Sequence, residues 1–304
     1  MKKTQSSEVR RRRSTFNRRR RLLPYLFILP NMAIFLAFTI WPAIRGVYIS
    51  FFESTDGRTF KYVGVQNYKS ILKDPTVHQV AAATGKYVVS YVVLSTVMAI
   101  ALAIVINQQV FLKGMYRAFI FLPVMLSPVV VGLIWSIMLD RKRGLVNTML
   151  AALGGGHPGW LIESNLAIIA VIFVGIWTHL GFYSIIALAG LQGIDGSLLE
   201  AASVDGASKR QITWRITLPL LRPTILVIVI LSTIQGFQAF DFIYTLTGGG
   251  PLGATTLVVQ YIYDSAFQTP IQYGLASASA VILFIFIFAA TALNFLIGKR
   301  NEAV

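Results

Sequence analysis

The chain has 304 residues, of which 55% are hydrophobic and 13% are charged, and its formal net charge is +15. The charged share is roughly half of that in an average soluble domain, which favours a membrane protein. There is no cysteine, which excludes a disulfide framework and a thiolate metal site. The three histidines, His78, His157 and His179, are far apart and show no ligand spacing, so no metal site is expected.

Six apolar blocks, each almost free of charge, divide the chain. A spanning helix needs about 20 apolar residues, and only helices or closed barrels satisfy their backbone in lipid. The blocks are too long for barrel strands and do not alternate. We therefore predict an all-α polytopic membrane protein with six transmembrane helices. The expected spans cover about residues 24–52, 87–110, 118–139, 166–190, 219–244 and 274–298.

The positive charge is concentrated before the first block, where residues 1–21 hold ten of the 27 Lys and Arg. An Arg-rich run can bind nucleic acid. Directly before an apolar block, however, it is more typical of a cytoplasmic flank that also suits anionic lipid head groups. We predict a basic cytoplasmic tail over residues 1–21, both termini in the cytoplasm, a transmembrane domain over residues 22–304, and no nucleic-acid partner. A cleaved signal peptide is not expected, because the apolar block is too long for one.

Between the blocks, the sequence offers little sign of catalysis. Pro30 and Pro42 should kink the first span, residues 53–85 should form an outer loop, and residues 145–150 a short surface helix. Gly154–Gly159 fits G-x-G-x-x-G, but it contains a proline and follows no strand, so it indicates a linker. With no Walker loop, H-E-x-x-H motif, nucleophile elbow or paired carboxylates, no enzyme activity is expected.

A polar, helix-prone segment, residues 195–218, separates the fourth and fifth blocks. Ser197 and Glu200 have the spacing of a capping box, and Gly206 is a natural helix stop. A second helix should begin near Ala207–Ser208 and run into the next span. The segment is therefore predicted to be a helix–Gly–helix elbow, hereafter the elbow, whose first helix suits binding in a partner's groove.

The elbow closely resembles the EAA motif of inner-membrane permease subunits of binding-protein-dependent ABC importers. Residues 240–251 and 188–194 resemble the carbohydrate-importing branch, which includes maltose and glycerol-phosphate importers, and specifically the first member of its permease pairs. Trp214 stands where the family usually has another aromatic residue, often Phe. The positions to which the resemblance assigns ATPase coupling are Glu200, Ala201, Ala202, Asp205, Gly206, Ala207, Trp214, Leu218 and Pro219.

The resemblance implies a type I ABC importer permease fold in a bacterial or archaeal cell membrane. It also implies three partners: a second permease, a cytoplasmic ABC ATPase dimer that binds ATP and Mg, and an extracytoplasmic sugar-binding protein. The elbow would be the coupling helix that docks on the ATPase, so that ATP-driven closure switches the permeases between inward-open and outward-open states. The alternative for Glu200 is a helix cap on a solvated loop.

Polar side chains inside spans are costly and usually face the bundle interior or a cavity. Gln235, Gln238 and Asp241 follow at i, i+3 and i+6 in the fifth block, so they should share one helix face. The fourth block also offers His179, a weaker candidate. Packing across helices or in an interface belt is the alternative for several of these residues. The candidate substrate path consists of Gln235, Gln238, Asp241, Phe237, Trp177 and Tyr183.

Two other classes of function fit less well. A secondary carrier would need buried ionisable residues, for which only Asp241 and His179 qualify, and it would not need the elbow. A membrane-embedded transferase would need carboxylates or histidines clustered at one interface. Within the importer class, glycerol phosphate or another small polar solute is the alternative cargo. A phosphate would favour an Arg or Lys inside the membrane. Apart from Arg45 and Arg222, near the ends of the first and fifth expected spans, none is evident, although the partner permease could supply one.

Overall fold

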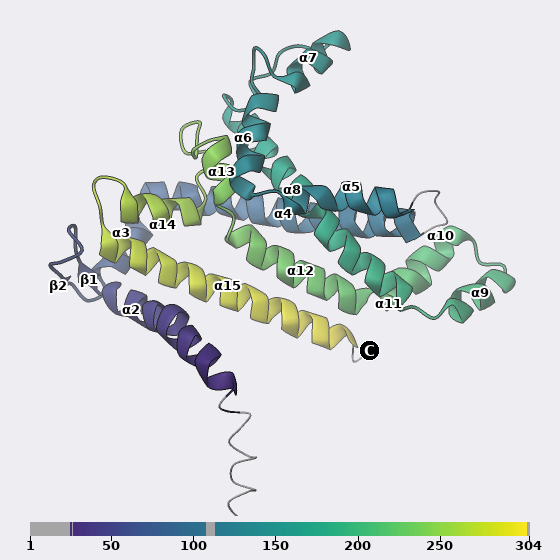
Figure 1. The fold of residues 1–304 in the computed structure, drawn as a ribbon, viewed down its shortest axis with the longest axis horizontal. Coiled ribbons are helices and arrows are strands. Elements are labelled where there is room, and N and C mark those ends of the chain that lie inside the picture. Colours follow the sequence, from purple (N-terminus) through teal and green to yellow (C-terminus); the bar gives the residue numbers. More distant parts are fainter. Residues whose placement is uncertain (1–24, 26, 108–112, 303–304) are drawn as a thin grey trace, which may run out of the picture.

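A computed structural model describes residues 25, 27–107 and 113–302, which are mostly helical (Figure 1). The predicted basic tail lies outside these residues. Within the described residues, four helices are long and apolar enough to cross a membrane, and two bent helix pairs raise the number of possible crossings to six. The multi-span helical body is therefore confirmed, whereas six spans is its upper limit.

The first of these helices, Phe27–Ile49, contains a π-helical turn at Leu36–Ile40. Its last part, α2 (Trp41–Ile49), follows directly, with Pro42 in its first turn. A proline lacks the N–H that its position would donate and clashes with the carbonyl four residues back. A wide π turn at this point accommodates the proline within one continuous helix.

The loop expected over residues 53–85 is largely regular structure. β1 (Phe52–Glu53) pairs antiparallel with β2 (Lys61–Tyr62), a small exception to the all-α prediction. α3 (Gln66–Lys73) follows. α4 (Pro75–Asn107) begins well before the apolar block, because the Asp74 carboxylate accepts from the Thr76 N–H at 2.8 Å just ahead of the first turn.

The core of the body is the packing of α4 against α8 (Ser164–Gln192). Buried side chains such as Tyr87, Tyr91 and Val174 lie between the two helices. Gly175 is required at this interface, since a Cβ there would lie 2.5 Å from the Tyr87 hydroxyl. Close contact at a glycine thus fixes α4 against α8, the helix that carries Trp177 and Tyr183 of the candidate substrate path.

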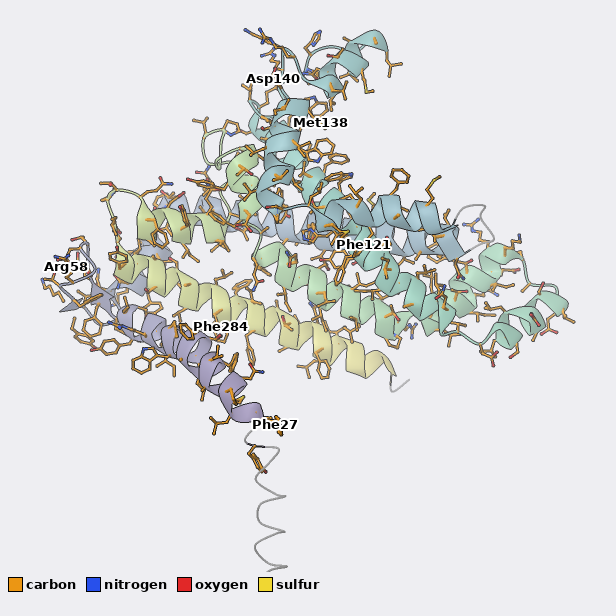
Figure 2. All side chains as sticks on the ribbon, in the orientation of Figure 1. Phe27, Arg58, Phe121, Met138, Asp140 and Phe284 are labelled. Atoms are coloured by element: carbon orange, nitrogen blue, oxygen red, sulfur yellow. The ribbon has the colours of Figure 1, made fainter. Side chains whose placement is uncertain are left out.

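The third apolar block is not one straight helix. It forms α5 (Lys113–Met125) and α6 (Pro128–Met138), whose apolar parts meet at 106°. Pro128 explains the break, because the residue before a proline is driven out of the helical region, and Ser127 has ψ of 132°. In Figure 2, Met138 and Asp140 lie far out on the arm that α6 forms. The predicted short helix is present beyond them as α7 (Leu145–Ala152).

The fifth apolar block is also divided, so residues 219–244 do not form one continuous helix. α12 (Arg222–Phe237) is bent by 65° from the helical stretch Lys209–Leu220 before it. The chain then leaves the helix and re-enters it as α13 (Asp241–Leu246). Two further helices complete the chain, α14 (Val258–Phe267) and α15 (Tyr273–Glu302).

Different elements form the two ends of the molecule (Figure 1). The β-hairpin, α3 and α14 lie at one end, which we call the hairpin end. The first helix of the elbow, α9 (Gly196–Val204), projects from the other end together with α10 (Lys209–Ile212). This second end is called the elbow end below.

Candidate coupling and substrate sites

The elbow begins with a cap that the sequence reasoning assigned to the wrong residue. Asp195, not Ser197, is the N-cap of α9: its carboxylate accepts from the Ser197 N–H at 2.9 Å. Donation by this backbone N–H lowers the pKa of the Asp195 carboxyl. The capping box expected for Ser197 and Glu200 does not form, since an Asp two residues earlier already satisfies the helix start.

Gly206 ends α9 as predicted, in a left-handed conformation with φ of +84°. The Ala207 N–H donates to the Ala202 carbonyl at 3.0 Å, and the Gly206 N–H donates to the Ser203 carbonyl at 3.1 Å. These two bonds define a Schellman motif, which satisfies carbonyls at a helix end and favours glycine at the left-handed position. The turn of the elbow is thus set by local backbone chemistry.

A capping box does occur, but it starts the second helix. The Ser208 N–H donates to the Gln211 Oε1 at 2.7 Å, and the Gln211 N–H donates to the Ser208 Oγ at 3.3 Å. The Ser-x-x-Gln spacing was visible in the sequence and could have located this helix start. From α10 the chain continues through a π-helical turn, Thr213–Thr217, and α11 (Leu218–Leu220) into α12.

The predicted coupling residues occupy three parts of the elbow. At its tip, α9 has no buried residue, and Val204 is 88% exposed. Trp214, 64% exposed, lies on the π-helical turn, and Leu218 and Pro219 are half-buried at the bend into α12. The tip residues are Glu200, Ala201, Asp205 and Gly206, which are exposed, and Ala202 and Ala207, which are half-buried.

The elbow has short connections to two long helices. Only residues 193–195 separate the end of α8 from α9, and the Gly193 N–H still donates to the Ala189 carbonyl at 3.2 Å. On the other side, the buried Leu221 joins α11 to α12, and its N–H donates to the Thr217 carbonyl at 3.0 Å. Short, hydrogen-bonded connections therefore join the elbow to both α8 and α12.

His179 joins the same two helices away from the elbow, near the middle of α8 and the C-terminal end of α12. Its Nδ1 lies 3.1 Å from the Gly175 carbonyl, and its Nε2 lies 3.3 Å from the Gln235 Nε2. A carbonyl only accepts, so in the neutral ring Nδ1 donates and Nε2 accepts from the Gln235 amide. The carbonyl oxygen of the exposed Gln235 side chain is then left to accept a hydrogen bond from another group.

Buried tyrosines surround the histidine on its other sides. The hydroxyls of Tyr91 and Tyr183 are hydrogen-bonded at 3.1 Å, and the Tyr91 ring meets the His179 ring edge-on at 6.1 Å. Tyr87 stacks on Tyr91 at 5.5 Å. Sequence reasoning singled out His179 and Tyr183 but not the cluster, because Tyr87 and Tyr91 come from a distant part of the chain; the spacing of four residues within each pair was the local signal.

Three of the candidate path residues are packed inside the chain. Tyr183 is 1% exposed. Trp177 packs edge-on against Trp135 at 5.4 Å, and Phe237 against Phe286 at 5.9 Å. For Trp177 and Tyr183, these contacts favour the alternative that the side chains pack against other helices of the chain.

The polar candidates Gln235, Gln238 and Asp241 are all exposed, but they do not share one helix face. α12 stops at Phe237, so Gln238 lies at its C-cap and Asp241 opens α13. The Phe240 ring packs against Tyr244 and Tyr263, with centroids 5.4 and 5.0 Å away, and this packing accompanies the departure from the helix. The described residues contain no group of three His, Asp or Glu that could hold a metal.

A multi-span helical body with a protruding helix–Gly–helix elbow is the architecture of a membrane permease component. Residues 92–302 match the family described as "Binding-protein-dependent transport system inner membrane component", and the chain belongs to this family. The resemblance first seen in the elbow is thereby confirmed.

The chain is similar to two relatives over nearly their whole length. The chain is 32% identical to the trehalose/maltose transport system permease protein MalF of Thermococcus litoralis, covering 91% of this chain and 94% of the relative. It is also 32% identical to the sn-glycerol-3-phosphate transport system permease protein UgpA of Agrobacterium fabrum, covering 90% and 94%. A crystal structure of a bacterial alginate ABC transporter, in complex with an alginate pentasaccharide-bound periplasmic protein, matches with a TM-score of 0.81, 26% identity and coverage of 93% and 96%.

Proposed function

We propose that this chain is one permease subunit of an ATP-driven importer that moves a carbohydrate across the cell membrane by alternating access. Relatives that carry trehalose, maltose or alginate support a carbohydrate cargo. The observation that carries the proposal is the exposed polar set Gln235, Gln238 and Asp241, which offers amides and a carboxylate to hydroxyl groups. His179 holds the Gln235 amide so that its carbonyl accepts from a sugar hydroxyl.

Glycerol phosphate remains the second candidate, because a relative of equal identity carries it. A phosphate would call for a cation on the path. In α12 and α13 the only Lys or Arg is Arg222, at the elbow end and far along α12 from Gln235. An uncharged polyol or sugar therefore suits these two helices better, unless a partner subunit supplies the cation.

In the proposed assembly, α9 docks on a separate cytoplasmic ATPase, which binds ATP and Mg. A second permease would complete the path, and a sugar-binding protein would deliver the solute on the side of the hairpin end. The elbow end would then be cytoplasmic, in a bacterial or archaeal cell membrane. The unburied α9, with its exposed Val204 and Glu200, supports this docking role, because a short helix without a buried side chain is suited to a partner's groove.

The geometry also suggests how docking reaches the solute. α8 ends at the elbow and α12 begins there. α8 carries His179 and α12 carries Gln235, so the contact between these two side chains joins the helices. When the ATPase moves α9, the two helices shift as rigid bodies. Their shift alters the position of the Gln235 amide, so that affinity for the solute changes with the state of the ATPase.

Two variants test the coupling role. Glu200→Lys reverses the charge at the docking tip, and Gly206→Pro removes the N–H and the positive φ on which the Schellman motif depends. We expect both to reduce co-purification of the ATPase and solute-stimulated ATP hydrolysis in proteoliposomes. Glu53→Lys makes the same charge reversal at the hairpin end and serves as the control for ATPase association. Full association and turnover in both elbow variants would contradict the proposal.

A second experiment tests the path. Gln235→Ala and Gln238→Ala should lower uptake of sugar while ATPase association stays intact, and competition by maltose, trehalose and glycerol 3-phosphate would rank the cargo classes. Wild-type uptake in both variants would remove these residues from the path. Competition by glycerol 3-phosphate alone would replace the carbohydrate by the second candidate.

A further inference from the structure

Outside the proposed coupling and substrate sites, a groove lies between α12 and α15 at the elbow end. Its volume is about 350 Å³. Gly298 allows the two helices to approach closely here, because a Cβ at this position would collide with Leu226. The groove, called the inner groove below, is lined mainly by Arg222, Ile225, Leu226, Val229, Asn294 and Ile297.

The lining has two chemically different parts. Arg222 places a guanidinium at the start of α12, and no carboxylate is among the lining residues. Ile225, Val229 and Ile297 form an apolar wall that leads from it toward the middle of the body. A cation beside an apolar wall is complementary to an anionic head group attached to a hydrocarbon chain.

The groove also lies at a suitable depth. Just before the bend at Leu221, on the helical stretch Lys209–Leu220 that leads into α12, Arg210, Trp214 and Arg215 line a second, shallow hollow. Exposed tryptophan and arginine of this kind are typical of the boundary between hydrocarbon and head groups. From Arg222 to Val229, α12 rises about 10 Å, which is less than the roughly 15 Å of hydrocarbon in one leaflet.

We propose that an anionic phospholipid of the leaflet at the elbow end occupies the inner groove. Its phosphate lies at the Arg222 guanidinium, and one acyl chain follows the apolar wall. The inference goes beyond the proposed function, but it places the elbow end at the same membrane face. A lipid held between α12 and α15 would stabilise the bend through which the elbow joins α12.

Two polypeptide occupants compete with this assignment. The first is the tail of residues 1–21, but its ten Lys and Arg would be repelled by Arg222. The second is the partner permease, which would displace the lipid. A photo-crosslinker at Ile297, which is 54% exposed, distinguishes these occupants by what it captures.

The test uses the full-length chain, purified with the subunits that accompany it, delipidated in detergent and titrated with phosphatidylglycerol or phosphatidylcholine. Bound lipid is counted by native mass spectrometry. We expect a preference for phosphatidylglycerol that Arg222→Gln reduces about fivefold, the change expected for one arginine at an anionic membrane surface. Val229→Phe, which fills the groove, should lower retention of both lipids.

Arg58→Gln is the matched control, because it removes the same charge at the hairpin end (Figure 2). Wild-type retention in Arg222→Gln and Val229→Phe, or an equal loss in Arg58→Gln, would overturn the proposal. So would capture of the tail or of the partner permease, rather than lipid, at position 297. Should Arg222→Gln fail to assemble, Val229→Phe and the crosslink still decide the question.

Discussion

Gly206 allows a sharp prediction because its surroundings separate backbone strain from crowding. A Cβ at this position would meet no atom within 4 Å, so space is not the reason for glycine. The reason is φ of +84°, which L-residues rarely adopt. Gly206→Ala therefore strains the backbone without any clash between side chains.

The cost follows from the left-handed conformation, which is about 1–2 kcal/mol less favourable for an alanine than for glycine. Since 1.4 kcal/mol corresponds to a factor of ten in an equilibrium constant, the ordered elbow becomes roughly five- to thirtyfold less populated relative to opened forms. Gly206→Asn should lose less, because asparagine tolerates this region best after glycine.

The assay combines two measurements on the same proteoliposomes. Hydrogen exchange of the α9 amides reports the local opening, and solute-stimulated ATP hydrolysis reports the coupling. Exchange should accelerate in the order wild type, Asn, Ala, and the concentration of ATPase needed for half-maximal stimulation should rise in the same order. Thermal unfolding of the membrane body should stay unchanged.

Gly196→Ala provides a matched control, because a Cβ there also meets nothing within 4 Å, whereas φ is not positive. Gly196 is the first residue of α9, so alanine there is neutral or slightly stabilising. If Gly206→Ala, Gly206→Asn and Gly196→Ala gave the same exchange rates and the same coupling, the argument from backbone strain would be refuted.

Three further predictions follow from the same geometry. His179→Leu removes the acceptor that orients Gln235, so we expect KM for uptake to rise about three- to tenfold with ATPase association unchanged, as one neutral hydrogen bond is worth about 1 kcal/mol; unchanged uptake kinetics would contradict the orientation. Gly175→Ala forces the Tyr87 hydroxyl away from α8. Overpacking of this kind lowers the free energy of unfolding by about 1–3 kcal/mol, so Tm should fall by several degrees. Gly114→Ala is the control, because the space around Gly114 is open and Tm should not change. The pKa of Asp195 is lowered in the folded elbow. The stability that its ionised carboxylate contributes is therefore present above the ordinary pKa near 3.8 and is lost as pH falls through the lower folded value. Hydrogen-exchange rates of the α9 amides in wild type and in Asp195→Asn should become equal only in acid.

Local signals explain what the sequence predicted well. A glycine stop, polar caps and a change from apolar to charged residues are read within a few positions, which is why the elbow was placed correctly to within a few residues. The apolar blocks likewise identified a multi-span body. Hydropathy measures contact with lipid rather than helix formation, however, and so it missed the polar start of α4 at Pro75.

Tertiary packing accounts for what the sequence did not predict. No apolar block shows in which direction a helix turns at Pro128, and the end of α12 coincides with the packing of Phe240 on Tyr263 from a helix much later in the chain. The His179–Gln235 contact joins residues 56 positions apart. The sequence could therefore nominate Gln235, Gln238 and Asp241 as polar candidates for the path, but it did not show that α12 ends before Gln238 and that Asp241 opens α13.

The π-helical turn at Thr213–Thr217 sets the rotational phase between the elbow and the membrane body. A π turn accommodates one residue more than an α turn, and each residue added to or removed from a helix rotates everything beyond it by about 100°. Loss of a single residue here would therefore leave α9 intact but present a different side of it to the proposed ATPase partner. In the proposed assembly, chain length between Ser208 and Leu221 would thus affect docking in its own right, independent of which side chains fill it.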